Sequence, residues 1–342
     1  MGGVRIGRRE MLLGSLVVAG GAVCTGVVGA EQAWALETPS IISCDGWEAR
    51  SARDAVRVHN KRPVRILVHH TATPNVADSS RDAGEALARG VQRFHMNTRG
   101  WIDSGQHFTI SRGGYVLEGR HRSLEVLRGG RRQVEGAHCT GQNIVAVGIE
   151  NEGTYTASGP PTVQWQRLRQ LCAYICQQYR IPPTEIFGHR DFKDTACPGD
   201  VLYTMLPKLR TQVADVLRED VTTAAVELVS WPLLRVADRG PRVQAAQHLL
   251  RASGETDVQP DGRFDRRTAD AVRHFQRANG TEEVNGMIGG ESWPLLVAPI
   301  GPAVSRREMV RAAAVLTDAP GAPSDMDVED WQRLLARKDA GR

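Results

Sequence analysis

Residues from about 40 to 215 mix short strand-like runs, rich in apolar residues, with helix-like segments. Three strand-like runs occur there: VRILVHHTAT at 64–73, GQHFTISRGGYVLEGR at 105–120 and NIVAVGIENEG at 143–153. Segments with helical spacing lie between and after them. The pattern predicts an α/β fold with a central mixed β-sheet flanked by helices.

Two helices are expected in this region. One precedes RFHMNTRGW at 93–101, and the other covers 162–180. In the second segment apolar residues recur every three to four positions and form a buried stripe. These are Leu168, Cys172, Ile175 and Tyr179.

The pattern changes near residue 220, and residues 231–297 read as short helices joined by Gly turns. One apolar stripe contains Val243, Ala246 and Leu250, and a second contains Ala271, Val272 and Phe275. The tetrapeptide Trp-Pro-Leu-Leu begins at 231 and again at 293, so it brackets the unit. We expect a small all-α domain here.

The N-terminus has the layout of an export signal. Paired arginines, Arg8 and Arg9, precede a Gly- and Ala-rich apolar run that ends in the small-x-small site Ala33-Trp34-Ala35. This layout predicts twin-arginine export and an extracellular or cell-wall location. A membrane anchor is the alternative, but glycines interrupt the run and make a spanning helix weak, so no stable membrane insertion is expected after signal removal.

The expected organisation is therefore an export signal, two domains, a linker and a tail. The ranges are 1–35 for the signal, 36–215 for the α/β domain, 216–230 for the linker, 231–297 for the helical domain and 298–342 for a tail without an assigned role. The formal net charge of +4 is mild and does not indicate nucleic acid as a partner.

Export permits disulfides, and the expected mature chain has five cysteines. Cys172 and Cys176 lie one helical turn apart, which is a poor spacing for a mutual bridge. Cys44 and Cys139 are the available partners for them, and the pairing stays open. This count leaves Cys197 free.

Cys197 is also a candidate metal ligand. It follows His189 by eight positions in IFGHRDFKDTACPGD, and the strand at 64–73 ends in His69 and His70. Adjacent strand residues point to opposite faces, so only one of these two histidines can enter a given site. Each motif alone is weak evidence, and a lone histidine at a strand end is usually structural. Together, two imidazoles and a thiolate would leave one coordination position open, as in catalytic zinc sites.

Four motifs together resemble the zinc-dependent N-acetylmuramoyl-L-alanine amidases, a family that includes the peptidoglycan recognition proteins. They are VHHTAT, GQHFTISRGGYVLEGR, GAHCTGQNIVAVGIENEG and GHRDFKDTACPG, within residues 60–210. The resemblance implies Zn²⁺ held by His69, His189 and Cys197, with His70 as a structural neighbour. It also implies peptidoglycan as the partner and hydrolysis of the bond between N-acetylmuramic acid and L-alanine.

The catalytic base follows from a closer resemblance. GIENEG is similar to the corresponding motif of cytosolic anhydro-muropeptide amidases, whose first Glu is the general base, and this implies that role for Glu150. The strand pattern agrees, because Glu150 shares a face with the small residues Ala146 and Gly148, which leave room for a ligand. The alternative is a solvated edge carboxylate, which we prefer for Glu152.

The sequence departs from parts of the family at two positions. Gln106 stands where many relatives have a Tyr that assists the reaction, and Thr195 stands where some have a Lys that stabilises the oxyanion. Thr195 can donate a hydrogen bond without charge. His138 matches an active-site histidine of the family that is not a zinc ligand, and the resemblance implies that it could help zinc hold the developing oxyanion. A merely structural histidine is the alternative.

Residues 231–297 resemble a helical peptidoglycan-binding domain through DGRFDRRTADAVRHFQRANG and NGMIGGESWPLL, although Asp265 stands where Gly is usual. The resemblance implies that this domain tethers the enzyme to the wall. Two other readings remain: a non-catalytic recognition protein, which Gln106 favours, and a cysteine hydrolase that uses Cys197 with His189. The three ligand-type residues favour the zinc amidase, and no helix start or oxyanion turn at Cys197 supports the thiol enzyme.

Overall fold

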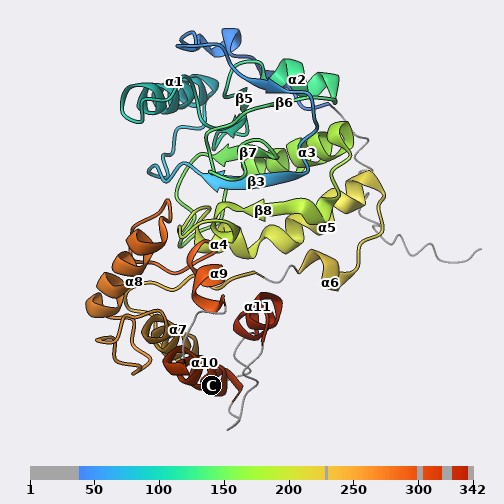
Figure 1. Ribbon diagram of the computed structural model, residues 1–342. Coiled ribbons are helices and arrows are strands. Elements are labelled where there is room, and N and C mark those ends of the chain that lie inside the picture. The colour runs from blue at the N-terminus through green and yellow to red at the C-terminus, as the bar shows by residue number, and fades with distance from the viewer. Residues whose placement is uncertain (1–37, 228–229, 299–302, 318–325, 338–342) are drawn as a thin grey trace, which may run out of the picture. The chain divides into compact units, whose positions relative to one another are not determined.

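The computed structural model describes residues 38–227, 230–298, 303–317 and 326–337 (Figure 1). The expected export signal at 1–35 lies outside the described residues. No helix within the described ranges combines the length and apolar character that crossing a bilayer requires.

A six-stranded mixed sheet forms the centre of the first domain (Figure 1), in the order β1-β5-β4-β7-β3-β8. Its strands are β1 (Ile41–Ile42), β3 (Arg65–His70), β4 (Phe108–Ile110), β5 (Val116–Glu118), β7 (Ala146–Asn151) and β8 (Ile186–Gly188). Only β4 and β5 pair antiparallel; the other neighbours are parallel. The strands β2 (Val58–His59) and β6 (Gln133–Val134) form a separate antiparallel pair. The expected mixed sheet is confirmed.

Helices α3 (Thr162–Tyr179) and α5 (Leu206–Leu217) cover one face of the sheet. Ile66, Val68, Val147 and Ile149 pack against them in the main core. The predicted stripe of α3 is buried there. Burying such side chains stabilises the fold by roughly 1.5–3 kcal/mol each.

The other face of the sheet carries polar side chains, including the His69 imidazole and the Glu150 carboxyl. Helix α1 (Arg81–Asn97) lies on this side, where its Ala88 packs with Trp47 and Leu117. We expected this helix to end before residue 93, but it continues to Asn97. The buried Met96 holds the last turn in place. The remaining short helices of this domain are α2 (Ser123–Gly129), α4 (Asp200–Thr204) and α6 (Thr223–Val226).

The second core is all-helical, as predicted. It contains α7 (Pro241–Ala252), α8 (Arg266–Asn279), α9 (Ser292–Val297), α10 (Ala303–Thr317) and α11 (Val328–Ala336). The two Trp-Pro-Leu-Leu segments meet, because the Trp231 and Trp293 rings stack with centroids 6.2 Å apart. Ala312 of α10 and Trp331 of α11 join the same core, so the described part of the C-terminal segment packs with the helical domain.

The disulfides expected among Cys44, Cys139, Cys172 and Cys176 are not formed. These four thiols and Cys197, the cysteines of the described ranges, are all free. Cys172 and Cys176 lie in the main core, whereas Cys44 and Cys139 belong to two separate small clusters. The fold buries the four as small apolar side chains in three different places.

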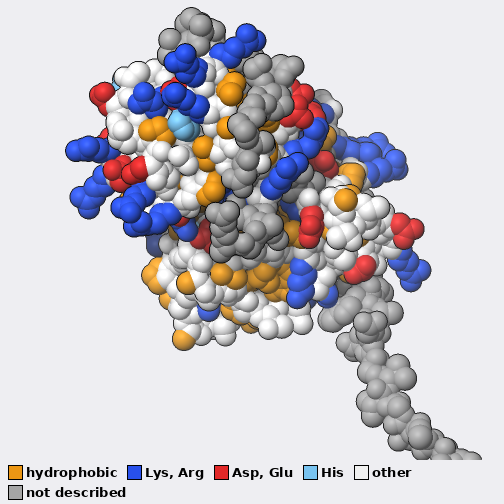
Figure 2. All heavy atoms as spheres, turned by 90° about the horizontal axis from the view of Figure 1, so that it is seen from below, with side chains coloured by type: hydrophobic (Ala, Val, Ile, Leu, Met, Phe, Trp, Pro, Cys, Tyr) orange, Lys and Arg blue, Asp and Glu red, His pale blue; other side chains and the backbone are white. Residues whose placement is uncertain are grey.

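The surface shown in Figure 2 mixes charges of both signs. Lys and Arg side chains are interspersed with Asp and Glu around apolar side chains, and no single continuous basic area dominates this face.

Candidate functional site

Three side chains converge where the parallel strands β3 and β8 end. His69 is the fifth residue of β3, and His189 directly follows β8, which pairs with β3. Cys197 arrives from the loop after His189. The possible ligand atoms of these three residues lie within 4.8 Å of one another. The structure thus brings together the three residues that the sequence singled out as metal ligands.

The donor set suits a tetrahedral metal ion. His69 Nδ1 lies 3.7 Å from Cys197 Sγ, close to the roughly 3.6 Å that separates N and S ligands of one tetrahedral zinc ion. Burial, with the neighbouring His189, holds the pKa of His69 well below its usual value, so its ring is neutral and has a lone pair for a metal. The backbone N–H of His70 donates to Cys197 Sγ over 3.4 Å. Such a donor favours a thiolate.

The thiol lacks the features of a nucleophilic cysteine. Burial and the nearby Glu150 raise the pKa of Cys197 well above its ordinary value. A reactive cysteine needs a lowered pKa, usually from a cationic neighbour. The adjacent imidazoles are neutral and do not supply one. Arg190 lowers the pKa of Cys197, but burial and Glu150 raise it by more.

Glu150 stands beside His69 on the neighbouring strand. The two are register partners in the parallel pair β3–β7, so their side chains leave the same face of the sheet. Glu150 Oε2 is inaccessible to solvent and receives no hydrogen bond from the described residues. Burial raises the pKa of this carboxyl to about 8. A carboxyl that is desolvated and unpaired next to possible metal ligands is suited to exchanging protons.

His138 fills the space that the sequence assigned to a ligand. A Cβ on Gly148 would come within 2.7 Å of the His138 ring, so this glycine makes room for an imidazole and not for a bound molecule. His138 Nδ1 lies 3.1 Å from His69 Nε2. The ring nitrogen of His69 that faces away from Cys197 therefore has a hydrogen-bond partner, as metal-bound histidines usually do.

Thr195 and Gln106 also line the cleft beside these residues. Thr195 Oγ1 accepts a hydrogen bond from the Cys197 backbone N–H over 3.2 Å, which leaves its own proton free to donate. Gln106 is buried and donates to Thr109 Oγ1 over 2.8 Å. Thr109 is the register partner of Glu150 on β4, so Gln106 joins the row of polar residues that crosses the sheet.

A cleft of about 480 Å³ connects these groups. Its lining includes His69, His189, Cys197 and Glu150, together with Phe94, Arg99 and Trp101. Glu283, Asn285 and Met287 of the helical domain also line it. This size is in the usual range for a site that takes a small molecule or a peptide segment.

Sequence reasoning missed two contributions to this site. His107 lies beneath His138, with ring centroids 5.4 Å apart, and its Nδ1 accepts from the Gly148 backbone N–H. Its place in the GQHF motif was the available signal. The wall formed by residues 283–287 had none, because nothing in the sequence pattern links that loop to residues some 90 positions earlier.

Comparisons with known proteins agree with the motifs. The family model described as "N-acetylmuramoyl-L-alanine amidase" matches residues 59–200, and the model described as "Putative peptidoglycan binding domain" matches residues 239–296. Human N-acetylmuramoyl-L-alanine amidase is 35% identical over 144 residues, which are 41% of this chain and 23% of that protein. The chain therefore spans about a quarter of the length of this relative.

The peptidoglycan recognition proteins match over more of their length. Drosophila melanogaster peptidoglycan-recognition protein LB is 29% identical over 192 residues, which are 55% of this chain and 78% of that protein. The solved structure of Drosophila PGRP-LB aligns with a TM-score of 0.43 at 30% identity and covers 49% of this chain and 93% of that one. Peptidoglycan recognition protein 1 of Bos taurus is 33% identical over 170 residues, which are 49% of this chain and 82% of the bovine protein. The chain belongs to the family of N-acetylmuramoyl-L-alanine amidases and peptidoglycan recognition proteins.

Proposed function

We propose that the protein is an exported zinc amidase that hydrolyses the amide bond between N-acetylmuramic acid and L-alanine in peptidoglycan. The convergence of His69, His189 and Cys197 within 4.8 Å, beside the unpaired carboxylate of Glu150, carries this proposal. A zinc ion on these three ligands would polarise the scissile carbonyl and activate a water molecule.

Glu150 is the general base in this proposal. Its carboxylate takes the proton of the attacking water and then delivers it to the departing amine of L-alanine. The register pairing with His69 supports this role, because it holds the carboxylate on the metal-facing side of the sheet. Zinc's positive charge would favour the ionised carboxylate, which opposes the effect of burial.

Thr195 and His138 have different supporting roles. We assign to Thr195 the hydrogen bond to the carbonyl oxygen, since its hydroxyl proton is free and it lines the cleft. His138 orients His69 and fixes its tautomer through the contact of 3.1 Å. This assignment for His138 differs from a direct hold on the oxyanion, because the outer ring nitrogen is buried.

The proposed organisation keeps residues 36–215 as the catalytic domain and 231–297 as the peptidoglycan-binding domain. An export signal at 1–35 and a linker at 216–230 complete it. Within 298–342, helices α10 and α11 extend the helical domain, an assignment supported by the packing of Ala312 and Trp331 in its core. Peptidoglycan, reached outside the cytoplasm, is the partner of both domains.

A recognition protein without catalysis is the second candidate. Gln106 supports it, since this position holds an amide that is tied to Thr109 where many amidases have a Tyr. Such a protein would bind muropeptides and leave them intact.

Product analysis on purified peptidoglycan tests the proposal. We expect the zinc-loaded protein to release stem peptides with a new free L-alanine amino terminus and glycan strands with unmodified muramic acid, as read by mass spectrometry. Removing the metal with a chelator abolishes release and added zinc restores it, since Cys197 and both imidazoles act through the metal. Cys197→Ser lowers zinc content and release together.

Glu150→Gln is the matched variant for the chemical step. We expect it to retain zinc and muropeptide binding and to lose activity by about a hundredfold or more. Muropeptide binding without cleavage by the wild-type protein would favour the recognition protein instead. Cleavage that resists chelation and zinc loss would contradict the metal mechanism.

A further inference from the structure

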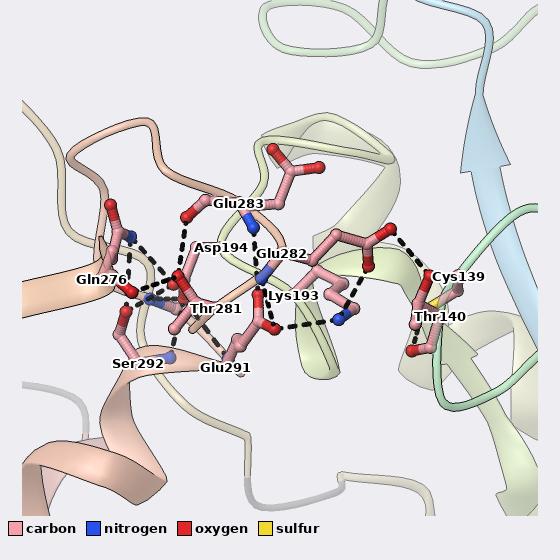
Figure 3. A network of polar contacts seen from close by, with 11 residues as sticks. Cys139, Thr140, Lys193, Asp194, Gln276, Thr281, Glu282, Glu283, Glu291 and Ser292 are labelled. Atoms are coloured by element: carbon pink, nitrogen blue, oxygen red, sulfur yellow. Dashed lines mark hydrogen bonds and ion pairs between the residues drawn. The ribbon is translucent and has the colours of Figure 1, made fainter. Parts of the chain in front are cut away.

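The helical domain is held against the loop that carries the proposed zinc ligands. Asp194 lies in this loop, between His189 and Cys197, and is fully buried. Its carboxylate accepts hydrogen bonds from residues of the helical domain, including Gln276, Ser292 and Glu291 (Figure 3). The donors are the backbone N–H groups of Gly289 (2.6 Å), Ser292 (3.0 Å) and Glu291 (3.3 Å), the Ser292 hydroxyl and the Gln276 amide (3.0 Å).

Further contacts surround Asp194. Lys193 Nζ forms ion pairs with Glu282 at 2.9 Å and Glu291 at 3.0 Å, and Glu282 also accepts from the Thr140 hydroxyl (Figure 3). The chain at Gly290 approaches so closely that a Cβ there would lie 2.3 Å from the Asp191 carbonyl oxygen. A desolvated carboxylate with this many donors holds two surfaces in one arrangement, unlike a domain on a free tether.

This docking places three side chains of the helical domain in the catalytic cleft. Glu283, Asn285 and Met287 line it together with Arg99, Trp101, His69 and Glu150. Asn285 is anchored, because its amide donates to the Asp194 carbonyl oxygen. In Figure 3 the Glu283 carboxylate points away from the Lys193 network, and among the described residues no hydrogen bond or ion pair involves it. Arg99 and Lys193 lower the pKa of this carboxyl at longer range, against the larger effects of burial and of Glu282 and Glu291.

We propose that the peptidoglycan-binding domain is a wall of the catalytic site, on which Glu283 and Met287 bind the peptide part of the substrate while it occupies the zinc centre. The inference rests on the proposed function. The half-buried carboxylate of Glu283 accepts from an N–H donor of the stem peptide, either a side-chain ammonium or an amide, and Met287 supplies apolar contact. Specificity for the peptide therefore depends on both domains. A domain that only tethered the enzyme to the cell wall would not affect peptide specificity.

Soluble muropeptides test whether Glu283 and Met287 contact the substrate in the cleft. A single disaccharide–peptide is too small to bind the zinc centre and a distant tethering site at the same time. The full-length wild-type, Glu283→Gln and Met287→Ala proteins are compared for kcat/KM and for Kd by calorimetry. Each is assayed on a fragment with a free side-chain amine and on the same fragment with that amine acetylated. Glu329→Gln, an exposed substitution on α11, is the matched control.

We expect Glu283→Gln and Met287→Ala each to weaken binding and kcat/KM for the free-amine fragment by about fivefold or more, with Glu329→Gln unchanged. If the ammonium is the partner, acetylation weakens wild-type binding and Glu283→Gln no longer distinguishes the two fragments. If an amide N–H is the partner, Glu283→Gln weakens both fragments equally.

The two proposals fail in different ways. If the wild-type protein cleaves the fragments and both Glu283→Gln and Met287→Ala keep the wild-type kcat/KM and Kd, the proposed role of these side chains is wrong and the amidase proposal is unaffected. Wild-type binding without cleavage, weakened by both variants, would overturn the amidase reaction and support the wall. Neither binding nor cleavage by the wild-type protein would overturn both.

Discussion

His107 shows how burial sets the chemistry of a single residue. Its Nε2 donates to the Val134 carbonyl oxygen and its Nδ1 accepts from Gly148, so the ring is held neutral under the proposed site. Burial lowers the pKa of His107 to about 4. The unfolded chain takes up a proton near the ordinary value of about 6.5, so acid favours unfolding through this residue.

The sign of the pH dependence follows from that difference. As the pH falls from about 6.5 toward 4, the unfolded state gains a proton that the folded state does not, and the free energy of unfolding decreases. We expect His107→Gln to reduce the dependence of the free energy of unfolding on pH in this range by up to about 1.4 kcal/mol per pH unit. This change in pH dependence is separate from any change in stability at neutral pH. Urea unfolding at pH 5, 6 and 7 measures it, and the exposed His274→Gln serves as control. Parallel curves for His107→Gln and wild type would disprove this.

At the scale of elements, helix α8 begins with Asp265 as its N-terminal cap. Asp265 stands where Gly is usual in the resembling domains, and its Oδ1 accepts from the Thr268 backbone N–H over 2.8 Å. The carboxylate also interacts favourably with the positive end of the helix. An Asp at this position therefore stabilises the helix that carries Val272 and Phe275.

We expect Asp265→Ala to lower the free energy of unfolding by about 1 kcal/mol. The matched substitution Asp270→Ala lies on the same helix with an exposed side chain and should have less than half that effect. Thermal and urea unfolding compare the two. Equal losses would mean that the cap does not act as described.

Local sequence patterns predicted some of the strands and helices correctly and missed other features. The apolar run in VRILVHH predicted β3 correctly, and the stripe of α3 is buried as expected. The predicted end of α1 was wrong. RFHMN has too few apolar residues to show a helical period, and the helix continues through it because Met96 is buried by packing. The disulfide prediction failed for a similar reason, since counting cysteines does not reveal that they lie in separate clusters.

At the scale of the whole molecule, the contact at Gly290 links the stability of the two cores. Its backbone N–H donates to the Arg190 carbonyl oxygen, and a Cβ would collide with Asp191. We expect the wild-type protein to unfold in one transition by circular dichroism and tryptophan fluorescence. Gly290→Ala should separate the contacting surfaces and yield two transitions, or a lower midpoint.

Gly129→Ala is the matched control, because a Cβ there meets no atom within 4 Å. It should unfold like the wild type. If Gly290→Ala also unfolds like the wild type, with an unchanged muropeptide Kd, the two domains are not coupled through this contact.

The sequence by itself determined the fold class, the family and the candidate ligands. Strand and helix periods are local, and His69, His189, Cys197 and Glu150 belong to short motifs that can be recognised without coordinates. Only the tertiary structure decided that Gly148 makes room for His138, that the cysteines are separate, and that residues 283–287 line the cleft. Each of these depends on contacts between segments far apart in the chain, and such contacts are set by packing of whole surfaces, which leaves no periodic trace in the sequence.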